Sequence, residues 1–380
     1  MPFVPLREGF VTQRAATRGP GAIAVGPRAV VLPGGEVLCS CMLASALGVN
    51  DFVPVLCRSA NGGETWTEQG PIWPYLQTRW SMFVSISRSP HPLPPGREGK
   101  SEGKCLFLYG TRTPIDEPGE SFWSDATQGL KQNELIWSMS ADGGRNWTDP
   151  AVIPMPVPGA AEAPGPLCCT RRGRWLVPYS PYNTFDPTLR VERNQVVVVT
   201  SDDRGGTWDH AAMLRFAGAD SGAAEAWVIE LSDGRLLGTC WHLSHGGNDH
   251  PNAYALSHDC GRTWSPTRST GILGQSTALA TLPDGRALFV YNQRRHGEPG
   301  VWLAVVRPTD TDFGIEANEL VWRAATPTQK GTSGEHTEWS DFSFGEPSVS
   351  VLSDETLLVV FWCIQSSGKG VRYLKLTRNL

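Results

Sequence analysis

The stretch Ser201-Asp202-Asp203-Arg204-Gly205-Gly206-Thr207-Trp208 is one of four copies of a single pattern, S-x-[DN]-x-G-x-x-W. The other three copies begin at Ser59, Ser140 and Ser257. Self-similarity at this spacing indicates a repeat architecture, in which each unit buries its apolar face only by stacking on its neighbours. We refer to the four copies as the box turns.

The residue types of the box turns predict tight turns between strands. Ser and Asp or Asn side chains hydrogen-bond nearby backbone N–H groups and close a turn. Gly accepts the positive φ that other residues resist, and the Trp is expected to fold back into the gap between packed sheets. Apolar runs that we interpret as strands precede the four copies, namely Val53–Leu56, Leu135–Met139, Gln195–Thr200 and Ala253–Leu256.

A second repeat consists of an apolar strand, a tight turn with Gly or Asp, and another apolar strand. Asp-Gly between apolar runs is a strong hairpin signal. Six such hairpins occur, at Arg28–Cys41, Met82–Tyr109, Pro166–Tyr179, Ala226–His242, Thr277–Asn292 and Pro347–Cys363. Four of them are followed by a box turn, and Thr309–Trp322 is interpreted as a degenerate box that kept only its Trp.

These repeats predict an all-β fold, a six-bladed β-propeller that forms a single domain over residues 1–380. The final strand, Gly370–Leu376, is expected to pair with the N-terminal segment, because closing the ring removes exposed sheet edges. The 41 Gly and 30 Pro fit this class, and no window shows sustained helical periodicity.

Composition also limits the partners. The net charge is −5 with scattered Lys and Arg, which argues against nucleic acid, and no apolar run is long enough to span a membrane. The first eight residues lack a signal-peptide core, which predicts a cytoplasmic protein. The nine cysteines contain no C-x-x-C pair, and we interpret them as small buried side chains, with a stray disulfide left open. The sequence predicts no cofactor and no metal, and it does not indicate the oligomeric state.

If the turns of the six hairpins mark one rim of the propeller, the opposite rim carries the functional side chains. Three glutamates there are candidate catalytic residues, because glycoside cleavage needs paired carboxylates: Glu162, Glu225 and Glu346. Aromatic and Arg side chains of this rim are suited to sugar rings and acidic sugars. The candidate substrate-binding residues are Arg79, Arg112, Tyr179, Trp241, His242, Gln275, Asn292, Arg294 and Asp341.

Because it combines four box turns with six expected blades, the whole chain resembles the sialidase superfamily of glycoside hydrolases. In that superfamily the Asp-boxes lie away from the active site. That family uses a Tyr nucleophile with a Glu partner, an Asp acid/base and three arginines. The resemblance places Glu225 at the family Glu and Glu346 where the family has its Tyr. The place of one family Arg is occupied by Cys240-Trp241-His242. Arg28 is displaced by a few residues from the position of another.

The sequence and the resemblance leave three alternative functions open. The first is an exo-acting glycoside hydrolase of this superfamily, acting on a carbohydrate other than sialic acid, because the arginines are incomplete. The chain also resembles exo-arabinanases that use two Glu, which Glu162 and Glu225 suit better. The second is a uronate lyase, which would use His242, His245, His250 or His336 beside Arg79 and Arg112. The third is a sugar-binding propeller without catalysis.

Overall fold

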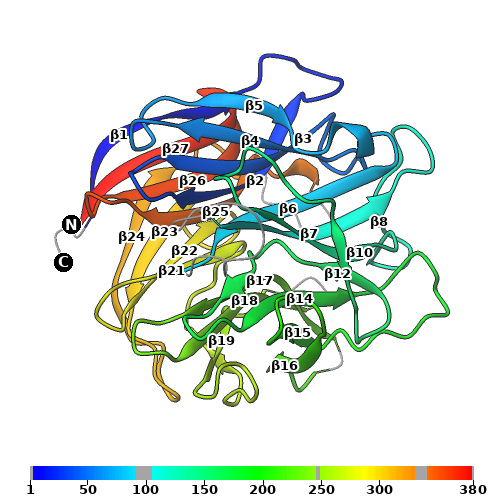
Figure 1. The fold of residues 1–380 in the computed structure, drawn as a ribbon, viewed down its shortest axis with the longest axis vertical. Coiled ribbons are helices and arrows are strands. Elements are labelled where there is room, and N and C mark those ends of the chain that lie inside the picture. The colour runs from blue at the N-terminus through cyan, green and yellow to red at the C-terminus, as the bar shows by residue number, and fades with distance from the viewer. Residues whose placement is uncertain (1–2, 91–104, 219, 245–248, 330–339, 379–380) are drawn as a thin grey trace.

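The computed structural model describes residues 3–90, 105–218, 220–244, 249–329 and 340–378. Six antiparallel sheets surround a central axis, and each forms one blade of a β-propeller (Figure 1). Strands of neighbouring blades contact one another around the ring. The predicted all-β, six-bladed fold is confirmed. No helix in the described ranges is long and apolar enough to cross a membrane.

Each blade is built from strands that run outward from the axis in sequence order. Blade one contains β2 (Ile23–Val31), β3 (Val37–Ala44), β4 (Val53–Ser59) and β5 (Thr67–Pro71). Blade two contains β6 (Trp80–Arg88), β7 (Leu106–Pro114), β10 (Glu134–Ser140) and β11 (Ala151–Ile153). The inner strand of blade three is split into β12 (Ala160–Glu162) and β13 (Cys168–Cys169), followed by β14 (Trp175–Tyr182), β15 (Gln195–Ser201) and β16 (Asp209–Arg215).

The remaining blades follow the same plan. Blade four contains β17 (Ser221–Glu230), β18 (Leu236–Ser244), β19 (Ala253–Ser257) and β20 (Arg268–Ser269). Blade five contains β21 (Thr277–Thr281), β22 (Ala287–Gln293), β23 (Gly300–Val306) and β24 (Ile315–Arg323). Blade six contains β25 (Phe344–Val351), β26 (Leu357–Gln365), β27 (Gly368–Arg378) and, as its outer strand, β1 (Phe3–Gln13). The predicted pairing of the last strand with the N-terminal segment is therefore confirmed.

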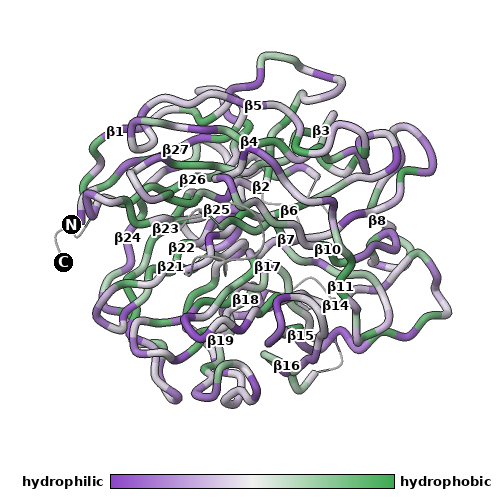
Figure 2. Tube along the Cα trace, viewed as in Figure 1, coloured by the Kyte–Doolittle hydropathy of each residue, from purple (hydrophilic) through white to green (hydrophobic). Residues whose placement is uncertain are grey.

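Outside the blades, a 3₁₀ turn (Pro74–Leu76) follows β5, and a short hairpin of β8 (Trp123–Ser124) and β9 (Gly129–Leu130) lies between β7 and β10. Hydrophobic residues follow the strands of the blades, where they form the packed layers between neighbouring sheets (Figure 2). All nine cysteines are free thiols, and six of them are buried.

The box turns close as their residue types predict. Ser201 Oγ accepts the N–H of Gly205 at 2.8 Å, and Asp203 Oδ1 accepts the N–H of Thr207 at 2.8 Å. The serines that open the other three copies accept the equivalent Gly N–H at 2.8–2.9 Å. The four box Trp side chains pack against four different core clusters.

The box glycine also contacts the preceding blade. A Cβ added at Gly261 would lie 2.4 Å from Leu176 Cδ2 of blade three, and one at Gly205 would lie 2.8 Å from Trp137 Cζ2 of blade two. Both glycines have a φ near +85°. The pattern therefore requires Gly for two reasons, backbone conformation and contact between blades.

The degenerate box of blade five differs from the prediction. Its turn is closed by Thr309 Oγ1, which accepts the N–H of Asp312 at 3.0 Å, and the buried aromatic residue is Phe313. Trp322 lies at the far end of β24, where its ring contacts Phe344 and Phe361. An aromatic residue directly after the turn thus occupies the place of the box Trp.

Candidate active site

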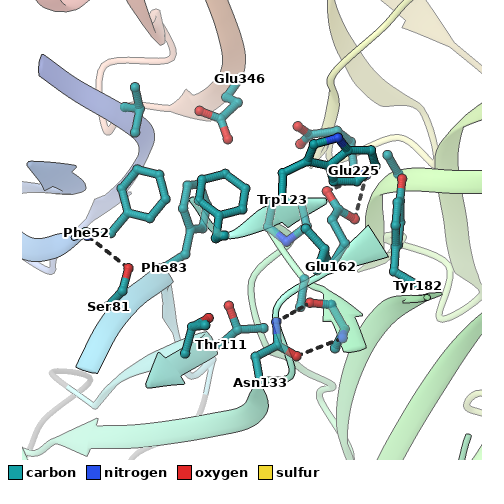
Figure 3. Close-up of a pocket in the computed structure, with 18 of the residues that line it drawn as sticks. Phe52, Ser81, Phe83, Thr111, Trp123, Asn133, Glu162, Tyr182, Glu225 and Glu346 are labelled. Carbon is teal, nitrogen blue, oxygen red and sulfur yellow. Dashed lines mark hydrogen bonds between the residues drawn. The ribbon is translucent and has the colours of Figure 1, made fainter. Parts of the chain in front are cut away.

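A cavity of about 240 Å³ is lined by residues from all six blades. The strand register places it away from the box turns. Ser257, which opens the box of blade four, pairs with Leu236, and Leu236 pairs with Glu230 at the end of β17. Glu225 lies five residues earlier on the same strand and lines the cavity. Glu162 and Glu346 line it too, so all three candidate catalytic glutamates meet here (Figure 3).

Two of these glutamates lie on β-bulges with strained backbone. The register of β17 shifts between Ala224 and Trp227, and that of β25 shifts between Gly345 and Ser348. Within these bulges Glu225 has φ +56° and Glu346 has φ +49°. The left-handed conformation costs a non-glycine residue roughly 1–2 kcal/mol. Bulges re-aim side chains, and backbone strain of this kind gathers at functional sites.

Glu162 and Glu225 are joined through the backbone. The N–H of Glu225 points at both carboxylate oxygens of Glu162, at 3.1 and 3.0 Å. Ser276 donates its hydroxyl to Glu225 Oε1 at 3.1 Å, and Arg28 Nη2 lies 3.7 Å from Glu225 Oε2. Glu225 therefore has a cation and a hydroxyl donor that favour its ionised form, whereas the nearest donor to Glu162 is a neutral amide.

The pKa values of the three carboxyl groups are raised. Burial, followed by the charge of Glu346, raises the pKa of Glu225 to about 7, and Arg28 opposes this. Burial and the charge of Glu225 raise the pKa of Glu162 well above its usual range. Burial also raises the pKa of Glu346, which accepts the N–H of Gly26 at 2.8 Å. Two carboxyl groups whose environments separate their pKa values are the arrangement required for acid and base roles.

Aromatic side chains form much of the cavity wall. Eight of them line it, namely Phe52, Phe83, Phe122, Trp123, Tyr182, Trp241, Phe342 and Trp362. Trp123 belongs to the β8–β9 hairpin and contacts Tyr182 edge-on, with ring centroids 6.3 Å apart. Such surfaces suit the apolar faces of sugar rings, while the carboxylates suit their hydroxyl groups.

Trp241 is held from behind by a buried carboxylate. Its Nε1 donates to Asp249 Oδ1 at 3.2 Å, and the side chain of Asp249 is only 2% exposed. Asp249 also contacts Gln275, Arg295 and His296, at 2.9–3.4 Å. The indole is therefore fixed in the cavity wall by a charged cluster behind it.

Two of the nine predicted substrate-binding residues, Trp241 and Arg294, line the cavity. Arg294 Nη1 donates to the carbonyl of Phe344 at 2.8 Å, and its guanidinium lies 3.5 Å from the ring centroid of Phe342. Burial, followed by the charge of Arg295, lowers the pKa of Arg294 to about 9. The other seven predicted residues lie elsewhere.

Three of those seven are buried and lie close to cavity residues in the sequence. The side chain of Gln275 accepts the N–H of Arg294 at 2.8 Å, and Asn292 and Asp341 are buried. Tyr179 belongs to a core cluster, where its hydroxyl accepts the N–H of Val157 at 3.2 Å. The residue that reaches the cavity is Tyr182, at the end of the same strand.

Of the residues named for a lyase, those that the structure describes do not line the cavity. Arg79 is exposed, and Arg112 pairs with Glu134 at 2.7 Å while stacking on Trp80. His242 stacks between Phe216 and His250, and burial lowers its pKa to about 4. His245 and His336 lie outside the described residues.

Several other wall residues are not predicted from the sequence. Phe52, Phe122 and Trp123 lie outside the hairpin repeat, in segments that carry no motif. Ser81 and Phe83 belong to the inner strand of blade two, and alternation along that strand could have identified them. The cation Lys131 also lines the cavity, where it is paired with Asp116 and Glu120 at 2.7 and 2.6 Å.

The sequence profile of the BNR repeat-like domain family matches residues 122–314, just over half of the chain. The chain belongs to this family. No curated protein matches it by sequence. Together with the six-bladed ring, the match identifies a sialidase-like BNR propeller.

Solved structures share this propeller fold. A protein of unknown function from Dyadobacter fermentans aligns over 100% of both chains, with a TM-score of 0.71 and 18% identity. The α-L-arabinanase of Penicillium chrysogenum, complexed with arabinobiose, aligns over 99% of this BNR propeller and 98% of its own chain, with a TM-score of 0.64 and 15% identity. The NanB sialidase of Streptococcus pneumoniae aligns over 99% and 71%, with a TM-score of 0.61 and 15% identity. At these identities the likeness concerns the fold, which is that of a glycoside hydrolase-like propeller.

Proposed function

We propose that this protein is an exo-acting glycoside hydrolase that removes a terminal sugar other than sialic acid. The observation that carries the proposal is the convergence of Glu162, Glu225 and Glu346 on one aromatic-lined cavity, two of them on strained bulges. A volume of about 240 Å³ lies just below the roughly 300–1,000 Å³ of pockets for drug-sized ligands, which favours one terminal sugar unit.

The environments of the two central carboxyl groups assign their roles. Glu225 has Arg28 and the Ser276 hydroxyl beside it and acts in its ionised form, as the nucleophile or as the base that activates water. Glu162, with its pKa well above the usual range, donates its proton to the leaving oxygen as the glycosidic bond breaks. Glu346 is suited to accept a hydrogen bond from a sugar hydroxyl.

A carboxylate-rich cavity with few available cations favours a neutral sugar over sialic acid. Arg28 is 1% exposed and contacts three backbone carbonyls, so it does not reach a ligand. Lys131 is paired with two carboxylates, which leaves Arg294 as the cation of the wall nearest to Glu225 and Glu346. A single Arg is a weak clamp for an anionic sugar.

The test is a panel of 4-nitrophenyl glycosides that covers arabinofuranosides, xylosides, galactosides, glucosides, sialosides and glucuronides. We expect turnover of a neutral glycoside, with a loss of at least about 10³-fold in kcat for Glu225→Gln. Glu162→Gln should lose activity mainly on the corresponding methyl glycoside, because methoxide needs a proton to leave and 4-nitrophenolate does not. Glu230→Gln is the matched control, because Glu230 lies on the same strand but pairs with Arg171 away from the cavity. Equal rates in wild type and Glu225→Gln would remove Glu225 from the mechanism.

Two further readouts separate the alternatives. Release of an unsaturated uronate that absorbs in the ultraviolet would replace hydrolysis with elimination, and binding without turnover would favour a non-catalytic propeller. The pH profile of kcat/KM should fall on its acidic side with a midpoint near pH 7, because Glu225 must be ionised. The anomeric configuration of the first product, followed by NMR, distinguishes retention from inversion.

A further inference from the structure

Arg28 is the largest fully buried charged side chain of the molecule's described part, and the proposed chemistry does not require it to touch the substrate. It lies on β2, directly after the bulge at Gly26 in blade one. Its guanidinium reaches across the propeller axis to three other blades. Each of those blades carries one of the three cavity glutamates.

The contacts of Arg28 are specific. Its Nε donates to the carbonyl of Pro164, two residues beyond Glu162, at 3.2 Å. Its Nη1 donates to the carbonyl of Glu346 itself at 2.9 Å. The guanidinium of Arg28 thus fixes the backbone beside two of the glutamates, one in blade three and one in blade six.

The remaining contacts involve blade four. The guanidinium carbon lies 5.0 Å from the ring centroid of Trp227, and Nη2 lies 3.7 Å from Glu225 Oε2. Neither Arg28 Nη2 nor Glu225 Oε2 has a hydrogen-bond partner in the described residues. A buried cation and a buried carboxylate oxygen that face each other in this way stabilise each other mainly by charge.

We infer that Arg28 is a positioning residue, which ties the three glutamate-bearing strands together and keeps Glu225 ionised while Glu162 retains its proton. The role of Arg28 in catalysis rests on the proposed hydrolase function, whereas its effect on the carboxyl groups does not. The inference separates Arg28 from the substrate-carboxylate arginines that the sialidase resemblance implies, because its Nε and Nη1 donate to backbone carbonyls and its Nη2 faces Glu225.

Several groups surround Glu225, and each influences its proton affinity. The charge of Arg28 and that of Arg294 lower the pKa of Glu225, while burial and the charge of Glu346 raise it. The titratable and charged groups that face it from the packed elements are Arg28, Glu162, Tyr182, Arg294 and Glu346. Among the cations Arg28 has the larger effect, in agreement with its 3.7 Å approach.

The experiment separates the charge of Arg28 from its hydrogen-bond donors. Arg28→Gln retains amide donors for the backbone carbonyls but removes the charge, and Arg28→Lys retains the charge but removes the planar fork. The protein is labelled with ¹³C at the Glu side-chain carboxyl, and the Glu225 signal is assigned by its disappearance in Glu225→Gln. Arg174→Gln is the control, because Arg174 is also buried but pairs with Asp202 away from the cavity.

We expect the midpoint of the Glu225 titration to rise by about one pH unit or more in Arg28→Gln, a tenfold change in proton affinity, and by less than half a unit in Arg28→Lys. Arg174→Gln should titrate like the wild type. If Glu225 in folded Arg28→Gln titrated with the wild-type midpoint, the inference would be overturned. If that variant does not fold, a shift of more than one unit in Arg28→Lys would overturn it equally.

No substrate enters this measurement, so the two proposals fail separately. A shifted titration in a protein without glycosidase activity would support the role of Arg28 in ordering the carboxyl groups and reject hydrolysis. An active enzyme in which the midpoint of the Glu225 titration does not change in the Arg28 variants would support hydrolysis and reject the role of Arg28. In an active enzyme, the acidic limb of the kcat/KM profile should move with the NMR midpoint.

Discussion

The two ends of blade four differ in how charged residues and backbone conformation are used. At the end that carries the box turn, the left-handed residues are Cys260 and Gly261, and the carboxylate of Asp259 accepts hydrogen bonds from its own turn. At the other end the left-handed residue is Glu225, whose backbone is strained and whose Oε2 has no hydrogen-bond partner in the described structure. The first arrangement serves stability, and the second is the kind that is retained for function.

The largest expected effect concerns the strained end. Glu225→Gly and Glu225→Ala should both lose at least about 10³-fold in kcat, because each removes the carboxylate. The Gly variant should nevertheless be more stable than the Ala variant by about 1 kcal/mol, since Gly accepts φ +56° without a steric penalty. Urea denaturation of both variants measures this difference. Equal stability would mean that the bulge carries no strain.

The next effect concerns the box end. Gly261→Ala should lower the free energy of unfolding by about 3 kcal/mol, because the new Cβ meets Leu176 at 2.4 Å in addition to the left-handed backbone. Gly271→Ala is the matched control in the same blade, since it has φ +78° but no atom within 4 Å of the added Cβ. It should lose only about 1 kcal/mol. If both variants lost the same amount, the contact between blades would contribute nothing.

The same contrast explains what the sequence could predict. The box turns are local: Ser, Asp and Gly within eight residues satisfy one another, so their residue types determine the turn. The glutamates could be predicted because each stands shortly before one of the six apolar hairpins in the sequence. The function of Arg28 depends on Pro164 and Glu346, which lie 136 and 318 residues away, and no local pattern encodes such contacts.

The aromatic wall was unpredictable for a related reason. Phe122 and Trp123 enter the cavity from the segment between β7 and β10, whose hairpin has no counterpart in the repeat. The predicted hairpin Pro166–Tyr179 stops three residues short of the end of β14, so its last residue, Tyr179, is not the cavity residue, Tyr182. Side chains alternate along a strand, so an error of an odd number of residues exchanges the buried face for the cavity face.

The smallest effect is a difference in how acid changes stability at the two ends. Hydrogen bonds of its turn, which outweigh burial, lower the pKa of Asp259 from 3.8 to about 2, so its contribution is present above pH 4 and is lost as the pH falls toward 2. Burial raises the pKa of Glu225 from 4.5 to about 7, so its contribution is present below pH 4.5 and is lost as the pH rises through 7.

Melting temperatures from pH 2 to 8 test both signs in matched variants. Asp259→Asn keeps the turn, since Asn61 occupies the equivalent place in the first box, and it should reduce the loss of stability below pH 4. Glu225→Gln should instead reduce the decline of the melting temperature between pH 5 and 8. Each variant should therefore alter the melting temperature in one pH range and leave the other range unchanged. A change in both ranges in either variant would mean that the two ends of the blade are coupled through the strand.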